Sequence, residues 1–111
     1  MFQLLRASNA RKDYTMYTPL PSCVTIKKSD IHGLGLWCVE KIEEGKEIGL
    51  SHFYWGDRLM RTPLGAFYNH SVTHDNIEKT QKDSRFFMVA KRTIWPGQEL
   101  LCNYTFYDPT I

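Results

Sequence analysis

The chain has few cysteines and no long apolar run. Its 111 residues include only three cysteines, Cys23, Cys38 and Cys102, which lie far apart and outside any C-x-x-C pair. This spacing argues against a disulfide framework and against a zinc ribbon. Nowhere do about 18 apolar residues follow one another, and the first residues lack the apolar stretch and the small-residue cleavage site of a secretory signal. We therefore expect a soluble, intracellular protein with reduced thiols.

An excess of charge of either sign is also missing. The sequence has 14 basic and 12 acidic residues, a formal net charge of +2, and no long block of a single sign. We therefore predict no direct contact with nucleic acid or with a membrane. With 42% hydrophobic and 14% aromatic residues the chain can build one small core, and it is too short for a second domain.

Glycine and proline mark the borders of the elements that we expect. The prolines of "TMYTPLP" favour extended structure, which predicts an N-terminal arm over residues 1–21 and a single domain over 22–111. Strand-like composition, separated by turn residues, predicts strands over 23–28, 35–40, 85–94 and 99–107, with another after Gly45.

Two further segments are predicted to be less regular. Residues 57–68 are expected to hold one or two helical turns broken by Pro63 and Gly65, and residues 72–84 are expected to form a polar loop. The sequence as a whole predicts a mostly β fold of short strands in small sheets, with little helix.

Two glycines separated by one residue stand out in "HGLGLW", residues 32–37. Such a pair lets the backbone adopt a positive φ or approach a ligand closely. A dinucleotide-binding loop would need a third glycine where Cys38 stands, and a helix after it. Taken alone, the stretch is therefore interpreted as a hairpin turn.

Three small polar side chains, Asn69, His70 and Ser71, end the stretch "GAFYNHS". They can form a turn or a helix cap, or they can line a ligand pocket. A serine hydrolase is disfavoured, because adjacent His70 and Ser71 rarely orient as base and nucleophile and no G-x-S-x-G elbow is present. His70 and His74 are spaced as metal ligands on a helix would be, but no third ligand is evident and no metal is expected.

The last stretch, "PGQELLCNYTFYDP", carries Tyr104, Phe106 and Tyr107. Each ring alone fits an ordinary strand that places alternate aromatic side chains in the core. That interpretation does not explain why this stretch follows the other two in this order.

Taken in order, the three stretches resemble the SET domain, the protein lysine methyltransferase fold that uses S-adenosylmethionine. The resemblance runs from about Ser22 to Asp108. It implies a SET-type β fold with a C-terminal pseudoknot, and methyl transfer from S-adenosylmethionine to a protein lysine. The residues that carry it are Gly33-Leu34-Gly35 for the G-x-G motif, Asn69-His70-Ser71 for N-H-S-C, and Gly97-Gln98-Glu99-Leu100 through Tyr104 for G-E-E-L with its tyrosine.

The resemblance also implies roles for individual residues. Tyr104 would be the catalytic tyrosine, Asn69 would hold the methionine end of the cofactor through its amide, and the backbone of His70 would recognise the adenine edge. A channel for the substrate lysine would be lined by Tyr54, Phe67 and Tyr107. The rest of the cofactor pocket would come from Gly33, Leu34, Gly35, Leu36 and Trp37, with Phe106 or Tyr107 stacked on the adenine.

The chain departs from the family pattern in three places. The N-H-S segment keeps a final asparagine, Asn76, but lacks the cysteine and proline of N-H-S-C-x-P-N. The zinc-binding cysteine cluster that follows many SET domains is absent. The insert that supports the peptide substrate before the N-H-S motif is much shorter, so the substrate is not implied by the resemblance.

Several expectations about partners and location remain. In size the chain is similar to small viral and bacterial SET proteins, some of which are dimers, so a homodimer stays open. The expected partner is a protein or peptide lysine, and the expected location is the cytoplasm, or the host cell interior for a viral protein, with the nucleus also open. Two other functions stay open: a catalytically silent SET-like module that senses the cofactor or binds a protein, and a small β domain of unrelated function.

Overall fold

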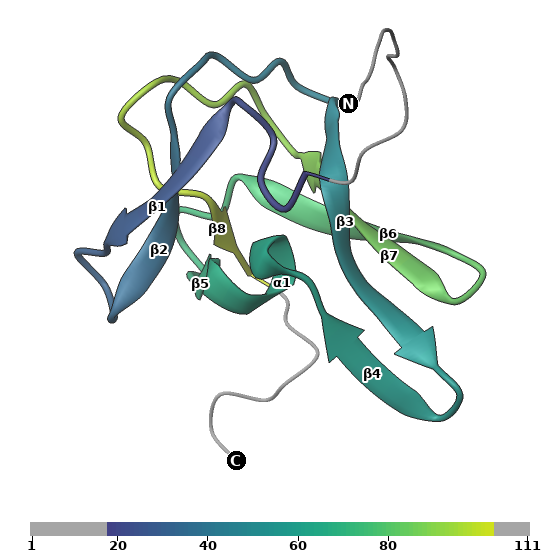
Figure 1. Ribbon diagram of the computed structural model, residues 1–111. Coiled ribbons are helices and arrows are strands. Elements are labelled where there is room, and N and C mark those ends of the chain that lie inside the picture. Colours follow the sequence, from purple (N-terminus) through teal and green to yellow (C-terminus); the bar gives the residue numbers. More distant parts are fainter. Residues whose placement is uncertain (1–17, 104–111) are drawn as a thin grey trace, which may run out of the picture.

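The computed structural model describes residues 18–103, which form two β sheets and one short helix (Figure 1). This architecture confirms the predicted mostly β fold class. Most of the predicted arm lies outside the described residues, and the division into arm and domain stays a prediction. The elements are β1 (Val24–Lys28), β2 (Leu34–Cys38), β3 (Glu47–Trp55), β4 (Arg58–Arg61), α1 (Pro63–Phe67), β5 (Asn69–His70), β6 (Ile77–Lys82), β7 (Arg85–Ala90) and β8 (Leu101–Cys102).

The smaller sheet is the predicted hairpin. Strands β1 and β2 pair in antiparallel fashion, with Ile26 opposite Leu36. The turn between them is closed by a hydrogen bond of 2.8 Å from the Ser29 amide to the Gly33 carbonyl. This hairpin lies to one side of the larger sheet (Figure 1), and the G-x-G motif spans the end of its turn and the start of β2.

The larger sheet has the strand order β4-β3-β7-β6-β8-β5. Its first four strands pair in antiparallel fashion, whereas β8 lies between β6 and β5 and runs parallel to both. The register places Asn69 beside Leu101 and His70 beside Cys102. The N-H-S segment and the C-terminal strand are therefore neighbours, as the resemblance requires. The threading of a pseudoknot stays a prediction.

Residues 97–100 join the two sheets. The Cys38 amide donates to the Gln98 carbonyl, and the Leu100 amide donates to the Leu36 carbonyl, both at 2.8 Å. The chain then enters β8 directly. Because the same residues pair with β2 and continue into the larger sheet, they bring all three sequence motifs to one region. Both sheets contribute to the core, whose fully buried apolar side chains include Leu36, Ile42, Met88, Ile94 and Leu100.

The segment between β3 and β5 differs from its prediction. Arg58–Arg61 forms strand β4, and the helix begins at Pro63 instead of being broken there. A proline is favourable at the first helical position, because its missing N–H would have no partner in the helix, and the Thr62 side chain caps the helix by accepting from the Gly65 amide. Gly65 is needed for packing, since a Cβ there would lie 2.0 Å from the Ser51 carbonyl oxygen.

The prediction of a loop over 72–84 was wrong for its second half. Ile77–Lys82 forms β6, which pairs with β7 along its whole length. Only Ile77 is buried, and the five residues after it are polar, so no apolar alternation marks the strand. Backbone pairing with β7 holds it in place. The strand predicted over 85–94 is shorter than expected and ends at Ala90.

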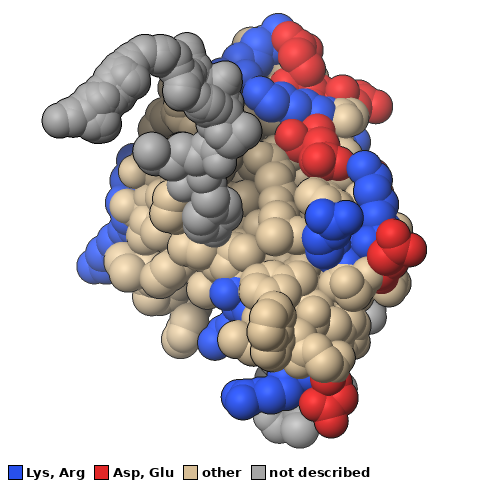
Figure 2. All heavy atoms as spheres, turned by 45° about the vertical axis from the view of Figure 1, so that its right-hand side comes forward, with Lys and Arg blue, Asp and Glu red and all other residues tan. Residues whose placement is uncertain are grey.

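The surface carries both signs of charge close together. On the face shown in Figure 2, basic and acidic side chains alternate around the edge of an area of other residues. The exposed large apolar side chains of the β3–β4 hairpin are Tyr54, Trp55 and Met60. Within the described range, no helix has the length and apolar character needed to cross a membrane.

Candidate functional site

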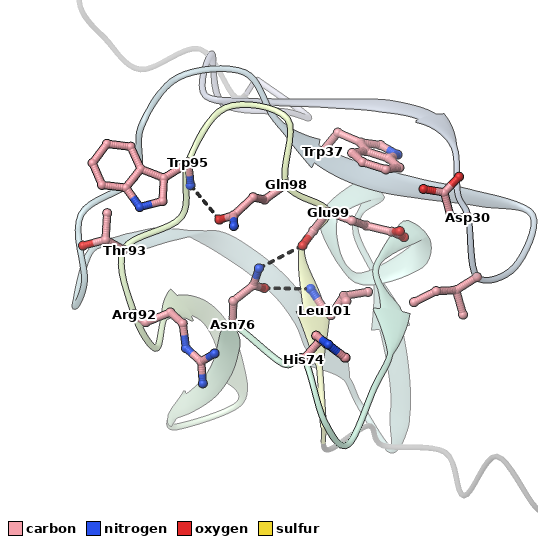
Figure 3. A pocket seen from close by; sticks show the side chains of 11 residues that line it. Asp30, Trp37, His74, Asn76, Arg92, Thr93, Trp95, Gln98, Glu99 and Leu101 are labelled. Atoms are coloured by element: carbon pink, nitrogen blue, oxygen red, sulfur yellow. Dashed lines mark hydrogen bonds between the residues drawn. The ribbon is translucent and has the colours of Figure 1, made fainter.

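An open cleft of about 770 Å³ lies where the motif segments meet (Figure 3). Its walls come from the β1–β2 turn, from Trp37 on β2, from the loop before β6, from residues 92–99 and from Leu101 on β8. This volume falls within the roughly 300–1,000 Å³ of small-molecule and cofactor sites. The cleft is therefore large enough for a ligand of cofactor size.

The two ends of the cleft differ in charge. Figure 3 shows Trp37, Asp30 and the Glu99 carboxylate toward one end, whereas Arg92 and Trp95 lie toward the other. A positively charged group of a ligand is favoured beside the two carboxylates, and a negatively charged group beside the guanidinium. The cleft is thus suited to a ligand whose charges are separated along its length.

Glu99 connects the motif segments at the acidic end. Its side chain is only 9% exposed, and each carboxylate oxygen accepts a hydrogen bond of 2.9 Å. Oε1 accepts from the Ser29 hydroxyl in the turn after β1, and Oε2 accepts from the amide Nδ2 of Asn69 on β5. A buried carboxylate is costly unless it is hydrogen-bonded in this way.

The amide of Asn69 has a defined orientation. Besides the Glu99 carboxylate, its Nδ2 faces the carbonyl oxygens of His32 at 3.2 Å and Leu34 at 3.1 Å. All three groups are acceptors, so the nitrogen and not the oxygen must face them. The amide oxygen forms no hydrogen bond within residues 18–103. It can therefore accept one from a ligand.

The two glycines of the G-x-G motif serve different purposes. Gly33 has a φ of 51°, a conformation that favours glycine in the turn. Gly35 has an ordinary φ, but a Cβ there would lie 2.2 Å from the Glu99 Oε2 and 3.1 Å from the Asn69 Nδ2. The first glycine shapes the hairpin, and the second lets Glu99 and Asn69 pack directly against β2.

Asn76, the final asparagine of the N-H-S segment, secures the floor of the cleft. Its Nδ2 donates to the Glu99 carbonyl at 2.9 Å, and its Oδ1 accepts from the Leu101 amide at 2.8 Å (Figure 3). A buried asparagine therefore holds the backbone on both sides of Leu100. The resemblance to the SET domain pattern includes this asparagine, but no role was predicted for it from the sequence.

His70 and Ser71 follow Asn69 and have separate environments. The Nδ1 atom of His70 is buried and has no hydrogen-bond partner among the described residues. The Ser71 hydroxyl accepts from the amides of Thr73 and His74 at 3.3 and 3.0 Å, as in a turn. Ser71 therefore stabilises a turn, which is the first of the two alternatives predicted for this stretch. Across residues 18–103 no three His, Cys, Asp or Glu side chains are grouped so as to hold a metal ion.

The other predicted site residues are distributed over the molecule. Trp37 lines the cleft, while Leu34 is exposed and Leu36 is fully buried with its carbonyl bonded to Leu100. Tyr54 lies on the β3–β4 hairpin against Phe86, with ring centroids 5.9 Å apart, and Trp37 is the only predicted site residue among residues 18–103 that lines the cleft itself. Asn69 reaches the cleft wall through its hydrogen bond to Glu99. Three predicted residues, Tyr104, Phe106 and Tyr107, lie outside the described residues.

A second group of polar residues lies on the other side of β8. Successive strand residues point to opposite faces, so Cys102 faces away from the cleft that Leu101 lines. The Lys79 ammonium lies 3.5 Å from the Cys102 sulfur and 4.4 Å from the centroid of the Tyr68 ring. Burial lowers the pKa of Lys79. No regular spacing in the sequence marks this group.

His52 belongs to the same side of the sheet. Its ring is fully buried on β3 and meets the Tyr68 ring edge-on at 6.4 Å. The Ser51 hydroxyl gives its only proton to the Phe86 carbonyl, so the His52 Nδ1 must donate to Ser51. Burial lowers the pKa of His52 to about 4, with further lowering by the charges of Lys79 and Arg61.

Solved structures with the same fold come from several eukaryotes. The methyltransferase domain of human PR domain-containing protein 2 is 17% identical, with a TM-score of 0.61 over 83% of this chain and 84% of that one. A Polycomb Repressive Complex 2 chain of Chaetomium thermophilum, in a structure with bound S-adenosylmethionine, is 21% identical with a TM-score of 0.62. There the match covers 78% of this chain but only 16% of that one.

A third similar structure is CpSET8 from Cryptosporidium, which is 21% identical, with a TM-score of 0.56 over 79% of this chain and 60% of that one. Among curated protein sequences none matches the chain. The family model of the SET domain matches residues 50–105, slightly more than half of the sequence. The chain belongs to the SET domain family.

Proposed function

We propose that this protein binds S-adenosylmethionine in the cleft and transfers its methyl group to a lysine side chain of a protein or peptide. The observation that carries the proposal is that Glu99, which lines the acidic end of the cleft, bonds to both Ser29 and Asn69 and packs against Gly35. Three segments far apart in the sequence contribute to one hydrogen-bonded group. Asn69 and Glu99 belong to two of the stretches that resemble the family's motifs, and Ser29 lies shortly before the G-x-G motif.

The residues present fit this cofactor. An amide oxygen at Asn69 is left to accept from a ligand, and the buried Nδ1 of His70 lacks a partner among residues 18–103. S-adenosylmethionine supplies an activated methyl group on a positively charged sulfonium, together with an α-ammonium and an adenine. Asn69 would hold the ammonium, and the backbone of Gly33 to Trp37 would line the pocket beside it.

Methyl transfer to an amine is a displacement in which the protein mainly positions the two partners, a contribution that can reach about 7–11 kcal/mol. Tyr104 would orient the acceptor amine through its hydroxyl. The lysine must lose a proton first, and its reference pKa near 10.4 falls in an environment that excludes water. The side of β8 that carries Cys102 has this character, since burial there lowers the pKa of Lys79.

Replacing Tyr104 by Phe tests the catalytic part of the proposal. The variant should bind S-adenosylmethionine with nearly unchanged affinity and methylate at least about 100-fold more slowly, because only the orienting hydroxyl is lost. Methylation is measured by mass spectrometry of proteins in a host lysate treated with the protein and the cofactor. Unchanged turnover would reject the role of Tyr104, and no cofactor binding by the unaltered chain would reject the proposal.

The short connection between β3 and the N-H-S segment favours a second candidate. The β3–β4 hairpin leads through Thr62 straight into α1, which ends just before Asn69. A SET-like module that binds the cofactor without turnover needs no substrate-supporting insert there. Cofactor binding without methylation of any lysate protein would favour this candidate. If the enzyme is a homodimer, as its size leaves open, the second copy would supply the support for the peptide substrate that the short insert does not provide.

A further inference from the structure

Glu99 is a buried acidic residue to which the proposed mechanism gives no part. It bonds to both Ser29 and Asn69 and lines the cleft at the same time. A side chain with the same shape but no charge, such as glutamine, would fill the same space. The identity of this residue therefore calls for a reason beyond packing.

The reason lies in the hydrogen-bonding chemistry of the carboxylate. An ionised carboxylate only accepts hydrogen bonds, so Glu99, together with the carbonyls of His32 and Leu34, requires the Asn69 amide to present its nitrogen, which lies 2.9 Å from the carboxylate. The amide oxygen is then directed away from Glu99. A glutamine at position 99 could turn its own amide nitrogen toward Asn69. The Asn69 amide would then either lose this acceptor or turn over against the His32 and Leu34 carbonyls, which would aim a donor where an acceptor had been.

We propose that Glu99 selects ligands that carry an α-ammonium group, because it fixes Asn69 with its amide oxygen as the acceptor for that group. The inference rests on the proposed cofactor site and goes beyond it, since it assigns a positioning residue and the ligand feature that the residue recognises. Ser29 supports Glu99 by donating to its other oxygen, and Gly35 leaves room for the carboxylate.

The test compares two ligands that differ in this feature. S-adenosylhomocysteine carries the amino acid with its ammonium, whereas 5′-methylthioadenosine has the same adenosine and thioether without it. Isothermal titration of the whole chain should show that Glu99→Gln weakens the binding of S-adenosylhomocysteine by about 10-fold or more. This is the effect expected from the loss of a charge-assisted hydrogen-bond partner. Binding of methylthioadenosine should change less than about 2-fold, and Glu78→Gln on the exposed side of β6 should change neither.

A double-mutant cycle separates positioning from a general effect on the fold. If Glu99 acts through the Asn69 amide, Glu99→Gln should have little further effect on S-adenosylhomocysteine binding in an Asn69→Ala background. Should Glu99→Gln fail to fold, Gly35→Ala displaces the carboxylate by crowding and should produce the same discrimination between the ligands.

The outcomes distinguish this inference from the function on which it rests. If Glu99→Gln weakens the binding of both ligands equally, or if the effects of Glu99→Gln and Asn69→Ala on binding are additive, the proposed role of Glu99 is overturned while the cofactor site stays intact. Binding of neither ligand to the unaltered chain would reject the site itself, and the inference with it.

Discussion

Polar side chains have opposite environments on the two sides of strand β8. On the cleft side, Asn69, Asn76 and Glu99 are held by hydrogen bonds to backbone and side-chain partners. On the Cys102 side, His52 and Lys79 are titratable groups whose charged forms are disfavoured by burial. The first side is organised before any ligand arrives, and the second disfavours positive charge.

This difference matches the two requirements of the proposed reaction. A charged cofactor needs fixed donors and acceptors, which the cleft provides at its acidic end. A lysine acceptor needs an environment that favours the neutral amine, and the lowered pKa of Lys79 is the kind of change that a substrate amine on that side would undergo. The four predictions below test one side of β8 at a time, beginning with the largest expected effect.

Asn76→Ala should destabilise the fold by about 4 kcal/mol, because it leaves the Glu99 carbonyl and the Leu101 amide buried without their partner. Chemical denaturation followed by circular dichroism measures this loss. Asn103→Ala, at an exposed position just beyond β8, is the matched control and should change stability by less than about 0.5 kcal/mol. Similarly small losses of stability in Asn76→Ala and Asn103→Ala would contradict the role of Asn76.

Acidification should destabilise the protein through His52. Its folded-state pKa of about 4 lies below the ordinary value of 6.5, so between these values the unfolded chain binds a proton that the folded chain does not. The contribution is present above pH 6.5 and is lost as the pH falls toward 4, by roughly 3 kcal/mol. Denaturation at a series of pH values should show this slope in the unaltered chain and a much smaller one in His52→Gln.

His74, exposed in the loop before β6, provides the matched control for this measurement. His74→Gln should keep the full slope between pH 6.5 and 4. A slope that disappears in His74→Gln, or that persists in His52→Gln, would contradict the assignment.

Gly35→Ala should affect the cleft side more than the fold as a whole. The added methyl group meets the Glu99 carboxylate, which must move and give up hydrogen bonds to Ser29 and Asn69, at a cost of about 2 kcal/mol. Denaturation and titration with S-adenosylhomocysteine measure the two effects. Gly49→Ala meets only the end of the Leu64 side chain, and should weaken ligand binding less than about 2-fold. Equal binding by Gly35→Ala and the unaltered chain would be inconsistent with a cofactor site here.

Lys79→Met should give the smallest change in stability. The variant loses the contact between the ammonium and the Tyr68 ring but no longer requires a charge to be buried, so the two effects partly cancel to within about 1 kcal/mol. The His52 pKa should rise, because a repelling charge has been removed. Nuclear magnetic resonance titration of the His52 ring measures this pKa, and a fall would contradict the repulsion between the Lys79 charge and the protonated His52 ring.

The sequence predicted the parts of the fold that carry an apolar pattern or a turn signal. The β1–β2 hairpin and its glycine turn were predicted because β-branched residues flank "HGLG". Strand β6 was missed because only Ile77 faces the core, and pairing with β7 leaves no mark in the sequence. The start of α1 at Pro63 was missed because proline ends a helix when it lies inside one but favours a helix at its first position.

The candidate site was predicted in its segments but not in its contacts. The motif order placed Asn69 near the C-terminal strand, and the register of β5 with β8 agrees. The role proposed for Glu99 could not be predicted from the sequence, because a glutamate after a turn is usually solvated. Only the folded chain reveals that Gly35 packs against its carboxylate. The group around His52 and Lys79 comes from three different strands and has no sequence spacing to detect.

The central claim is that the cleft beside Gly35, Asn69 and Glu99 is the cofactor site. Its most direct test is a comparison of ¹H–¹⁵N spectra of the whole chain with and without S-adenosylhomocysteine. We predict that the largest shifts occur at Gly35, at the Asn69 side-chain amide and along residues 97–101, with the tip of the β3–β4 hairpin unchanged. Shifts confined to that hairpin, or none at saturating ligand, would contradict the claim.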